Sequence, residues 1–508
     1  MRRVAACALL AAFLSCSCSS PSPPDPGIIT LAVRSGPTTL DPRQGADEAS
    51  QRVAQLIFSS LMEWGDDLRV HPGLAERLDN PDPLTYIAHL RRGVRFHDGR
   101  ELTARDVVYT FGAFVDPSFV SPLKGAYAVL RSVTAIDDYT VRFTLREPFA
   151  AFPIQLVLPP VVPDGSGDRM RTAPVGTGPY RFVHYDADDT LVLAAFEGFW
   201  KGAPKNKGLV IKVIPDDTMR GLELRRGTAD LVVNDLPADI VHQLDEDGSF
   251  QIAQSPGLDF SYLAFNMRDP VLADRRVRHA IGYAIDREAI IAHLRRGLAR
   301  PASGLLPDQA WAYEPEVHRF THDPARAMRL LDEAGYRDPD GSGPAPRLRL
   351  SLKISTNEET RLQSTVIQEH LRRIGIELDL RSYEFATFFA DVLRGNFQMV
   401  SLAWTGGGLV DPDILRRVFH SSQVPPFGFN RGFYQNPDVD RWLDLATYST
   451  DEAERERAYR EVQKIVAVDA PYIPLWNRTN VVVAQRSLDG VHLNAIADVQ
   501  TLKDVARR

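Results

Sequence analysis

The chain has 508 residues, of which 44% are hydrophobic and 25% are charged, and its formal net charge is −7. This length exceeds what one hydrophobic core usually supports, so we expect two or three globular domains. The balance is mildly acidic and the arginines are scattered, whereas nucleic acid requires a basic face. We therefore expect no nucleic-acid partner.

The first 16 residues predict a signal peptide for export. Arg2 and Arg3 precede an apolar run over residues 4–14, which is too short to cross a bilayer. The letters FLSC at residues 13–16 resemble a bacterial lipoprotein box and predict a lipid on Cys16. An ordinary cleaved signal peptide is the alternative.

The cysteines of the chain, Cys7, Cys16 and Cys18, all lie in this region. We therefore expect neither a disulfide nor a cysteine-based metal site in the folded body, and Cys18 is the second candidate for lipidation. Residues 17–26 are rich in serine and proline and predict a disordered tether. The protein is thus expected to be exported to the periplasm or cell surface and to meet the membrane only through its lipid anchor.

Strand patterns recur along the body. Alternating or continuous apolar residues predict strands at residues 28–33, 86–90, 94–96, 136–145, 230–233, 260–266, 348–354, 376–380, 397–404 and 480–484. Residues 471–476 predict an extended segment that leads into the last strand.

Helical spacing of apolar residues alternates with these strands. It predicts helices at residues 49–61, 104–114, 275–291, 323–334, 362–374, 438–448 and 452–468. Thr103 is placed to cap the second of these helices, and Asp323 with Pro324 to start the fourth. A further helix is predicted to end near Gly227. Strands alternating with helices indicate an α/β architecture.

Catalytic motifs are missing from the sequence. His97, beside Asp98 in a tight turn, predicts a solvated side chain rather than an acid–base group. The bend at residues 174–180 lacks the third glycine of a dinucleotide loop. Because no nucleophile with a base partner and no cluster of metal-binding residues is visible, we expect a protein that is not an enzyme and has no cofactor and no metal.

Residues 397–415 carry the strongest signal of a binding site. A buried strand ends at Trp404, three glycines follow at 406–408, and Asp411 with Pro412 predicts a helix start. Bare backbone N–H groups beside an aromatic wall are how α/β proteins build small-molecule pockets at the carboxyl ends of strands. A glycine turn beneath a core tryptophan is the alternative.

Nine segments of the chain resemble, in order, the extracytoplasmic solute-binding proteins of ABC importers of the dipeptide/oligopeptide-binding type, family 5. RGVRFHDGRELTARDVVYTF, residues 92–111, is the most specific part of the match. The segments lie at residues 39–42, 86–111, 174–182, 262–267 with 276–291, 323–336, 368–378, 397–415, 434–446 and 469–477.

The resemblance implies a two-lobe periplasmic-binding-protein fold of class II, cluster C, with a hinge and an extra subdomain in lobe I. Such a protein is a monomer that closes on its solute and delivers it to permease and ATPase subunits. The implied parts are lobe I at residues 27–263 with the subdomain at about 45–172, lobe II at 264–481, a C-terminal return to lobe I at 482–508, and crossovers at 262–266 and 477–483.

The loop after the tryptophan departs from the family pattern. In peptide-binding relatives an aspartate in this loop pairs with the peptide's α-ammonium group, but here no acid precedes Asp411. We assign Asp411 to helix capping, with ligand binding as the alternative. Plain dipeptides are therefore predicted to bind weakly, and the glycine N–H groups are suited to a carboxylate or another acceptor.

The ligand-binding residues implied by the match are Trp404, Thr405, Gly406, Gly407, Tyr262, Asn266, Trp476, Asn477, Thr39 and Leu40. Ordinary packing or hinge hydrogen bonding is the alternative role for each. The ligand itself stays open among peptides, nickel chelates, haem, sugars and opines. A receptor that presents its ligand-bound form to a sensor or chemotaxis system is the main rival function.

Overall fold

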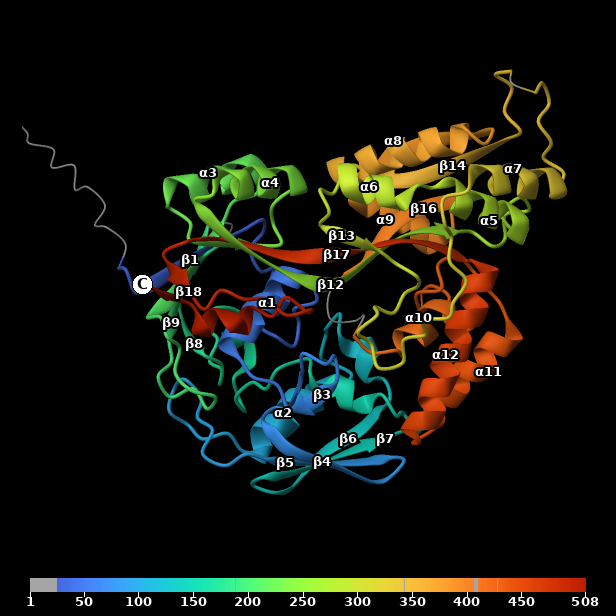
Figure 1. Ribbon diagram of the computed structural model, residues 1–508. Coiled ribbons are helices and arrows are strands. Elements are labelled where there is room, and N and C mark those ends of the chain that lie inside the picture. The colour runs from blue at the N-terminus through green and yellow to red at the C-terminus, as the bar shows by residue number, and fades with distance from the viewer. Residues whose placement is uncertain (1–24, 188, 342, 406–409, 427) are drawn as a thin grey trace, which may run out of the picture.

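The largest element of the fold is an 11-stranded mixed sheet built around two long central strands, β12 (Phe250–Phe265) and β17 (Tyr472–Gln485) (Figure 1). The computed structural model describes residues 25–187, 189–341, 343–405, 410–426 and 428–508. β12 and β17 pair antiparallel from Phe250 opposite Gln485 to Ala264 opposite Tyr472. β12 carries the chain from the first half of the molecule into the second, and β17 carries it back.

The sheet extends outward from this pair on both sides, in the order β15-β14-β16-β12-β17-β11-β1-β10-β9-β8. The strands of the first half are β1 (Ile28–Val33), β8 (Tyr180–Asp186), β9 (Thr190–Ala195), β10 (Gly208–Val213) and β11 (Leu231–Val233). Those of the second half are β13 (Ala299–Pro301), which pairs with β17, β14 (Leu348–Ser355), β15 (Ile376–Tyr383) and β16 (Met399–Trp404).

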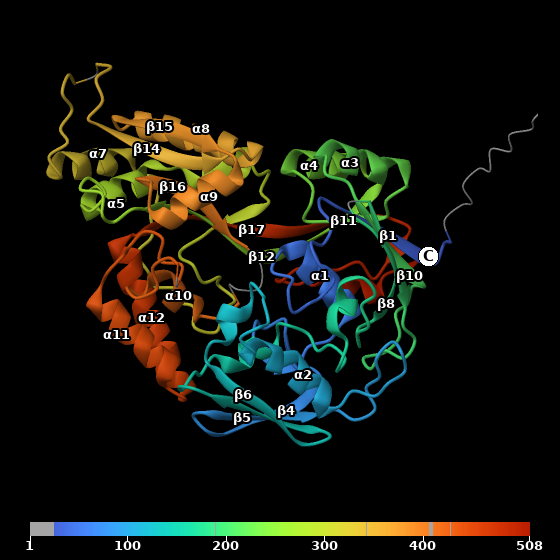
Figure 2. The same cartoon turned by 180° about the vertical axis from the view of Figure 1, so that it is seen from behind.

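Helices cover the two halves separately. The first half carries α1 (Glu48–Ile57), α2 (Ala104–Val115), α3 (Asp217–Arg226) and α4 (Ala238–Asp247). The second carries α5 (Arg275–Ala284), α6 (Arg287–His293), α7 (Pro324–Glu333), α8 (Glu358–Arg372), α9 (Phe385–Arg394), α10 (Ile414–Phe419), α11 (Pro437–Tyr448) and α12 (Glu452–Asp469). Helices α3, α4, α6 and α8 lie on one side of the β12–β17 pair, and α1, α2 and α10 lie on the other (Figures 1 and 2).

A separate four-stranded antiparallel sheet forms part of the first half, in the order β4-β5-β7-β6. Its strands are β4 (Ala75–Asp82), β5 (Thr85–Leu90), β6 (Leu130–Asp137) and β7 (Thr140–Leu145), and α2 packs against it. The short remaining elements are β2 (Met62–Trp64), β3 (Val70–Pro72), β18 (Leu488–Asp489), β19 (Ala506–Arg507), and the 3-10 helices η1 (Lys124–Tyr127), η2 (Phe152–Leu156), η3 (Gly167–Arg171) and η5 (Val499–Asp504).

Most predicted elements are confirmed, and the α/β class with them. The predicted helix over 275–291 is wrong, because the chain leaves the helical conformation at Ile285 and α6 starts anew. Asp286 causes the restart, since its carboxylate accepts a hydrogen bond from the Ala289 N–H at 2.9 Å. The segments predicted at 471–476 and 480–484 are one continuous strand, β17, and β12 begins ten residues before Phe260.

The two faces of the sheet in the second half bury different cores. Leu263 and Phe265 of β12 pack with the residues around α5 and α8 on one face. Tyr262 and Ala264, which alternate with them, pack with residues of α9, α10, α11 and α12 on the other face. The second of these cores is the one that reaches the end of β16.

The two halves touch beyond the central strands. Leu68 of the first half is buried in the core formed by α9 to α12. Arg69 pairs with Glu452 of α12 at 2.8 Å, and the Ala150 N–H donates to the Thr447 carbonyl at 3.2 Å. The two halves are therefore in direct contact away from the central strands. No helix in the described part of the chain is long and apolar enough to cross a membrane.

The prediction that His97 is solvated is wrong. Its Nδ1 accepts a hydrogen bond from the Gly176 N–H at 3.3 Å, and its Nε2 donates to the Gly178 carbonyl at 3.0 Å. Burial lowers the pKa of His97 to about 4, so the ring is neutral at pH 7. The two glycines press against the end of α1, where a Cβ on Gly176 would lie 2.1 Å from the Ile57 carbonyl oxygen.

Candidate ligand-binding site

Strand β16 ends at Trp404, which lies opposite Phe260 of β12. The indole is only partly buried and packs against the ring of Phe429 with 5.2 Å between ring centroids. Thr405, the next residue, is exposed. Gly406 and Gly407, which the sequence also implicates, lie outside the described residues. The partly exposed indole at the end of β16 is thus an aromatic surface that a solute can contact.

Arg431 packs directly on this tryptophan. Its guanidinium carbon lies 4.7 Å from the ring centroid of Trp404, 5.4 Å from that of Phe429 and 4.9 Å from that of Phe389 in α9. The residue is only 8% exposed. Among the described residues it makes no ion pair, and its Nε is fully buried without a partner. We call Trp404, Phe429, Phe389 and Arg431 the Arg431 cluster.

An aromatic stack from the two central strands adjoins this cluster. The ring of Tyr262 is stacked between Phe260, at 5.4 Å, and Tyr472, at 4.3 Å. The hydroxyls of both tyrosines are buried without a hydrogen bond of good geometry to any described residue. Burial raises the pKa of Tyr262, and the positive charge of Arg431 acts in the opposite direction. The guanidinium therefore lies close to these hydroxyls.

Two partly buried carboxylates, Asp411 and Asp413, lie just before α10. The helix begins at Ile414, so the prediction that Asp411 caps a helix starting at Pro412 is wrong. Asp411 instead accepts a hydrogen bond from the Asp413 N–H at 2.7 Å. Burial and the neighbouring charge of Asp413 raise the pKa of Asp411 to about 7. The opposing charge on this carboxylate comes from Arg455, not from Arg431.

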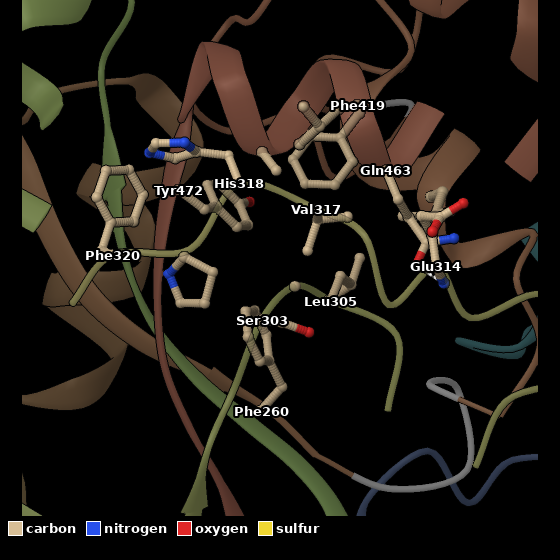
Figure 3. Close-up of a pocket in the computed structure, with 15 residues that line it drawn as sticks. Phe260, Ser303, Leu305, Glu314, Val317, His318, Phe320, Phe419, Gln463 and Tyr472 are labelled. Carbon is tan, nitrogen blue, oxygen red and sulfur yellow. Dashed lines mark hydrogen bonds between the residues drawn. The ribbon is translucent and has the colours of Figure 1, made fainter. Parts of the chain in front are cut away.

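A small cavity lies behind the aromatic stack (Figure 3). Phe260 and Tyr472 form one wall, and Phe419, His318 and Leu305 contribute to the others. Its volume of about 30 Å³ has room for no more than a few water molecules. A cavity of this volume is too small for an organic solute.

A larger groove of about 360 Å³ is lined by residues of α4, of α8 and of the segment that follows α6. Most of its charged side chains are paired within the protein. Arg295 bonds Glu359 at 3.0 Å, and Asp239 bonds Arg296 of the other half at 2.7 Å. Arg478, which also lines the groove, has no ion pair among the described residues, but its guanidinium donates to the Asn234 carbonyl.

No group of three or more His, Cys, Asp or Glu side chains is arranged to hold a metal ion in the described ranges. The site offers donors instead. In the part of the chain that the structure describes, the Nε of Arg431 and the indole N–H of Trp404 have no partner, and the two tyrosine hydroxyls make no hydrogen bond of good geometry. Such a set is suited to a ligand that accepts hydrogen bonds.

Comparison with known proteins decides the family. The model for bacterial extracellular solute-binding proteins, family 5, matches residues 69–425. The chain belongs to this family. The glutathione-binding protein GsiB of Pectobacterium atrosepticum is 31% identical over 476 residues, which cover 91% of each chain.

Other family 5 proteins are similar over nearly the whole length. Heme-binding protein A of Haemophilus influenzae is 31% identical over 453 residues, covering 83% of this chain and 82% of that protein. The solved structure of the ABC transporter-associated periplasmic binding protein DppA of Helicobacter pylori, in complex with the peptide STSA, superposes with a TM-score of 0.79 at 26% identity. That superposition covers 94% of this chain and 98% of DppA. The fold is therefore the two-lobe fold of periplasmic binding proteins.

The other site residues implied by the family match lie near the central strands. Asn266 is buried, and its amide donates to the Gly395 and Phe397 carbonyls at 3.0 Å each. Asn477 is also buried, and its amide donates to the Leu258 carbonyl at 3.4 Å. Trp476 is fully buried in the core on the opposite face from Tyr262, beneath the guanidinium of Arg295.

Thr39 and Leu40 lie in the first half of the chain beside α1. The backbone N–H of Thr39 donates to the Ser50 hydroxyl at 3.3 Å, and Leu40 is buried in the core around α1 and β1. These contacts support the fold locally, and a ligand role for either residue stays a prediction. Trp404 alone among the described candidates combines partial exposure with an unpaired polar atom.

Sequence reasoning missed Arg431, Phe429 and Phe389. Phe429 and Arg431 lie just before the stretch that matched the family, which began at Tyr434. The available signal was an arginine inside an aromatic run, FGFNRGFY, at residues 427–434. That pattern does not reveal whether the arginine finds a counter-ion, because its neighbours come from distant parts of the chain.

Proposed function

We propose that this protein is the extracytoplasmic solute-binding component of an ABC importer, which captures a small solute between its lobes and delivers it to the membrane subunits. The observation that carries the proposal is the Arg431 cluster beside the crossover strands. Unpaired donors gather where β12 passes between the lobes, so a solute bound there would contact both the moving lobe and the hinge.

Lobe boundaries follow the family match in this proposal. Lobe I comprises residues 27–263 with a subdomain at about 45–172, lobe II comprises 264–481, and residues 482–508 return to lobe I. The contacts of Leu68 and Arg69 with lobe II support a closed state that solute would stabilise over an open one. Closure buries the solute, and the permease recognises the closed form.

The proposed working form is a monomer without catalytic activity. A lipid on Cys16 would hold it at the membrane after export, and residues 17–26 would be the tether. Permease and ATPase subunits are its proposed partners. The names of its relatives, which bind glutathione, haem or a peptide, make peptides and similar small solutes the first class to test.

Thermal unfolding of the protein from Asp25 onward tests the proposal. Free-acid tripeptides and tetrapeptides, glutathione, haem and a nickel–histidine complex are added one at a time. We expect at least one class to raise the melting temperature in a saturable way, because a ligand that binds only the folded state stabilises it. Failure of every class would contradict solute capture of this kind.

An experiment in the source bacterium distinguishes a transport function from a sensing function. Deletion of the gene is expected to abolish uptake of the solute identified in vitro. Uptake that persists together with the loss of a transcriptional or chemotactic response would favour the receptor function. Adjacent permease and ATPase genes would favour transport.

A further inference from the structure

The Arg431 cluster contains a buried cation that the protein leaves without a counter-ion. Cation–π contact with Trp404, Phe429 and Phe389 offsets part of the cost of burying a guanidinium, but rings do not neutralise its charge. A buried charge is normally paired with an opposite charge or held by several hydrogen bonds. Among the described residues Arg431 has no opposite charge, and its Nε has no hydrogen-bond partner.

The chain cannot supply the missing anion from the segment next to Trp404. Residues 406–409 are three glycines and a leucine, and residue 427 is phenylalanine, so none of them carries a carboxylate. The nearby acids have other cationic neighbours, which are Arg455 for Asp411 and Arg416, Arg417 and Arg455 for Asp413. A counter-ion for Arg431 therefore has to come from outside the chain.

The neighbouring groups are donors as well. The indole N–H of Trp404 is buried without a partner, and the hydroxyls of Tyr262 and Tyr472 make no hydrogen bond of good geometry to a described residue. All four groups can donate a hydrogen bond, although the tyrosine hydroxyls can also accept one, and such a set matches a planar anion with several lone pairs. A guanidinium binds a carboxylate through two parallel N–H···O bonds.

We propose that Arg431 anchors a carboxylate of the bound solute, with Trp404 covering the remainder of that group. This assignment rests on the proposed solute-binding function and names its ligand class as carboxylic acids. The polarity is opposite to that of a site that holds a ligand's ammonium group. Specificity then follows from charge, since an amide or ester at the same position leaves Arg431 unpaired.

The test compares one set of tripeptides and tetrapeptides in two forms, as free acids and as C-terminal amides. Binding to the wild-type protein from Asp25 onward is measured by calorimetry. We expect the free acids to bind at least about 30-fold more tightly, since removing one partner of a buried charge pair is costly. Arg431→Gln is expected to abolish this preference. Arg417→Gln, which removes an exposed arginine stacked on the same Phe429 ring, is expected to retain it.

Each outcome bears on one claim. Equal affinity of the wild-type protein for acids and amides would overturn the carboxylate anchor while leaving solute capture intact. A preference for acids that survives in Arg431→Gln would also overturn the assignment. Binding of neither form would contradict the proposed peptide function and this assignment with it. If Arg431→Gln does not fold, Arg431→Lys keeps the charge but loses the planar fork, and we expect it to reduce the preference about tenfold.

Discussion

Two buried arginines of this protein, Arg220 in α3 and Arg431 beside β16, have similar burial and opposite surroundings. Arg220 is 0% exposed and donates to the carbonyls of Ile214, Pro215 and Asp235 at 2.5, 2.9 and 2.8 Å. It also pairs with Asp217. Arg431 is 8% exposed, packs against aromatic rings and makes no ion pair among the described residues. The chain itself supplies hydrogen-bond and ion-pair partners for Arg220. It supplies no opposite charge for Arg431 among the described residues.

Comparing the two arginines distinguishes a residue that stabilises the fold from a residue of the candidate binding site, without the use of any related protein. A buried polar group that is fully satisfied contributes to folding, and removal leaves its partners without bonds. A buried group that is unsatisfied costs stability and calls for an explanation, such as a functional role or a bound water or ion. Arg278, which donates to the Leu272 and Ala273 carbonyls at 2.7 and 2.9 Å, belongs with Arg220.

The largest expected effect is on unfolding. Arg220→Met should lower the free energy of unfolding by about 3–5 kcal/mol, because three carbonyls and a carboxylate lose their donor. Arg431→Met should change it by less than about 1 kcal/mol, since no ion pair among the described residues is lost and methionine still packs on the rings. Urea unfolding of both variants without solute measures the difference. An equal loss of unfolding free energy in both variants would contradict the distinction between the two arginines.

Close packing in lobe I provides the next test. Gly176→Ala should destabilise by about 1–3 kcal/mol, because the new Cβ would lie 2.1 Å from the Ile57 carbonyl oxygen. Gly112→Ala in α2, where nothing lies within 4 Å of the added atom, is the matched control and should be neutral or slightly stabilising. Solute affinity should be unchanged in both variants, since neither glycine is near Trp404. A loss of solute affinity in Gly176→Ala would show that packing around Gly176 affects the binding site.

Much of this framework could be predicted from the sequence, because the signals are local. Asp323 with Pro324 starts α7 as predicted, and Asp323 accepts a hydrogen bond from the Arg326 N–H at 2.8 Å. Thr103 and Asp106 form a capping box at α2. The break before α6 was missed because the apolar spacing continues through it, and only the cap by Asp286 interrupts the helix.

The site was less predictable for a physical reason. Trp404 could be selected from its place between a strand and a glycine loop, which is a pattern along the chain. Arg431 could not be selected, because its distinctive property is the lack of a partner in three dimensions. His97 was misjudged in the same way, since its partners Gly176 and Gly178 lie about 80 residues away in sequence.

The pH dependence of stability tests the neutral His97. Its pKa in the folded protein is about 4, compared with 6.5 ordinarily, so the unfolded chain binds more protons between these values. Stability should therefore fall as the pH drops from about 6.5 to 4, by up to ~1.4 kcal/mol per pH unit from this group. His97→Gln should flatten the profile in that window, whereas His242→Gln on the surface of α4 should not. An unchanged profile in His97→Gln would contradict the buried neutral ring.

The smallest expected effect concerns Asp411. Its pKa is raised to about 7, so the folded protein binds more protons than the unfolded chain between about 3.8 and 7. Stability should decline as the pH rises through that window, and Asp411→Asn should remove the decline. We expect the variant to be more stable than the wild type by about 1 kcal/mol at pH 8 and no more stable at pH 4. Equal stability at pH 8 would indicate that Asp411 is not destabilised by charge.

Native mass spectrometry of the protein from Asp25 onward, purified from cells and compared before and after unfolding, tests the central claim most directly. We predict one small solute per chain, released by unfolding, that gains mass on methyl esterification because it carries a free carboxylate. A bound solute without an acidic group, or a protein that stays empty after exposure to every class tested, would contradict the account.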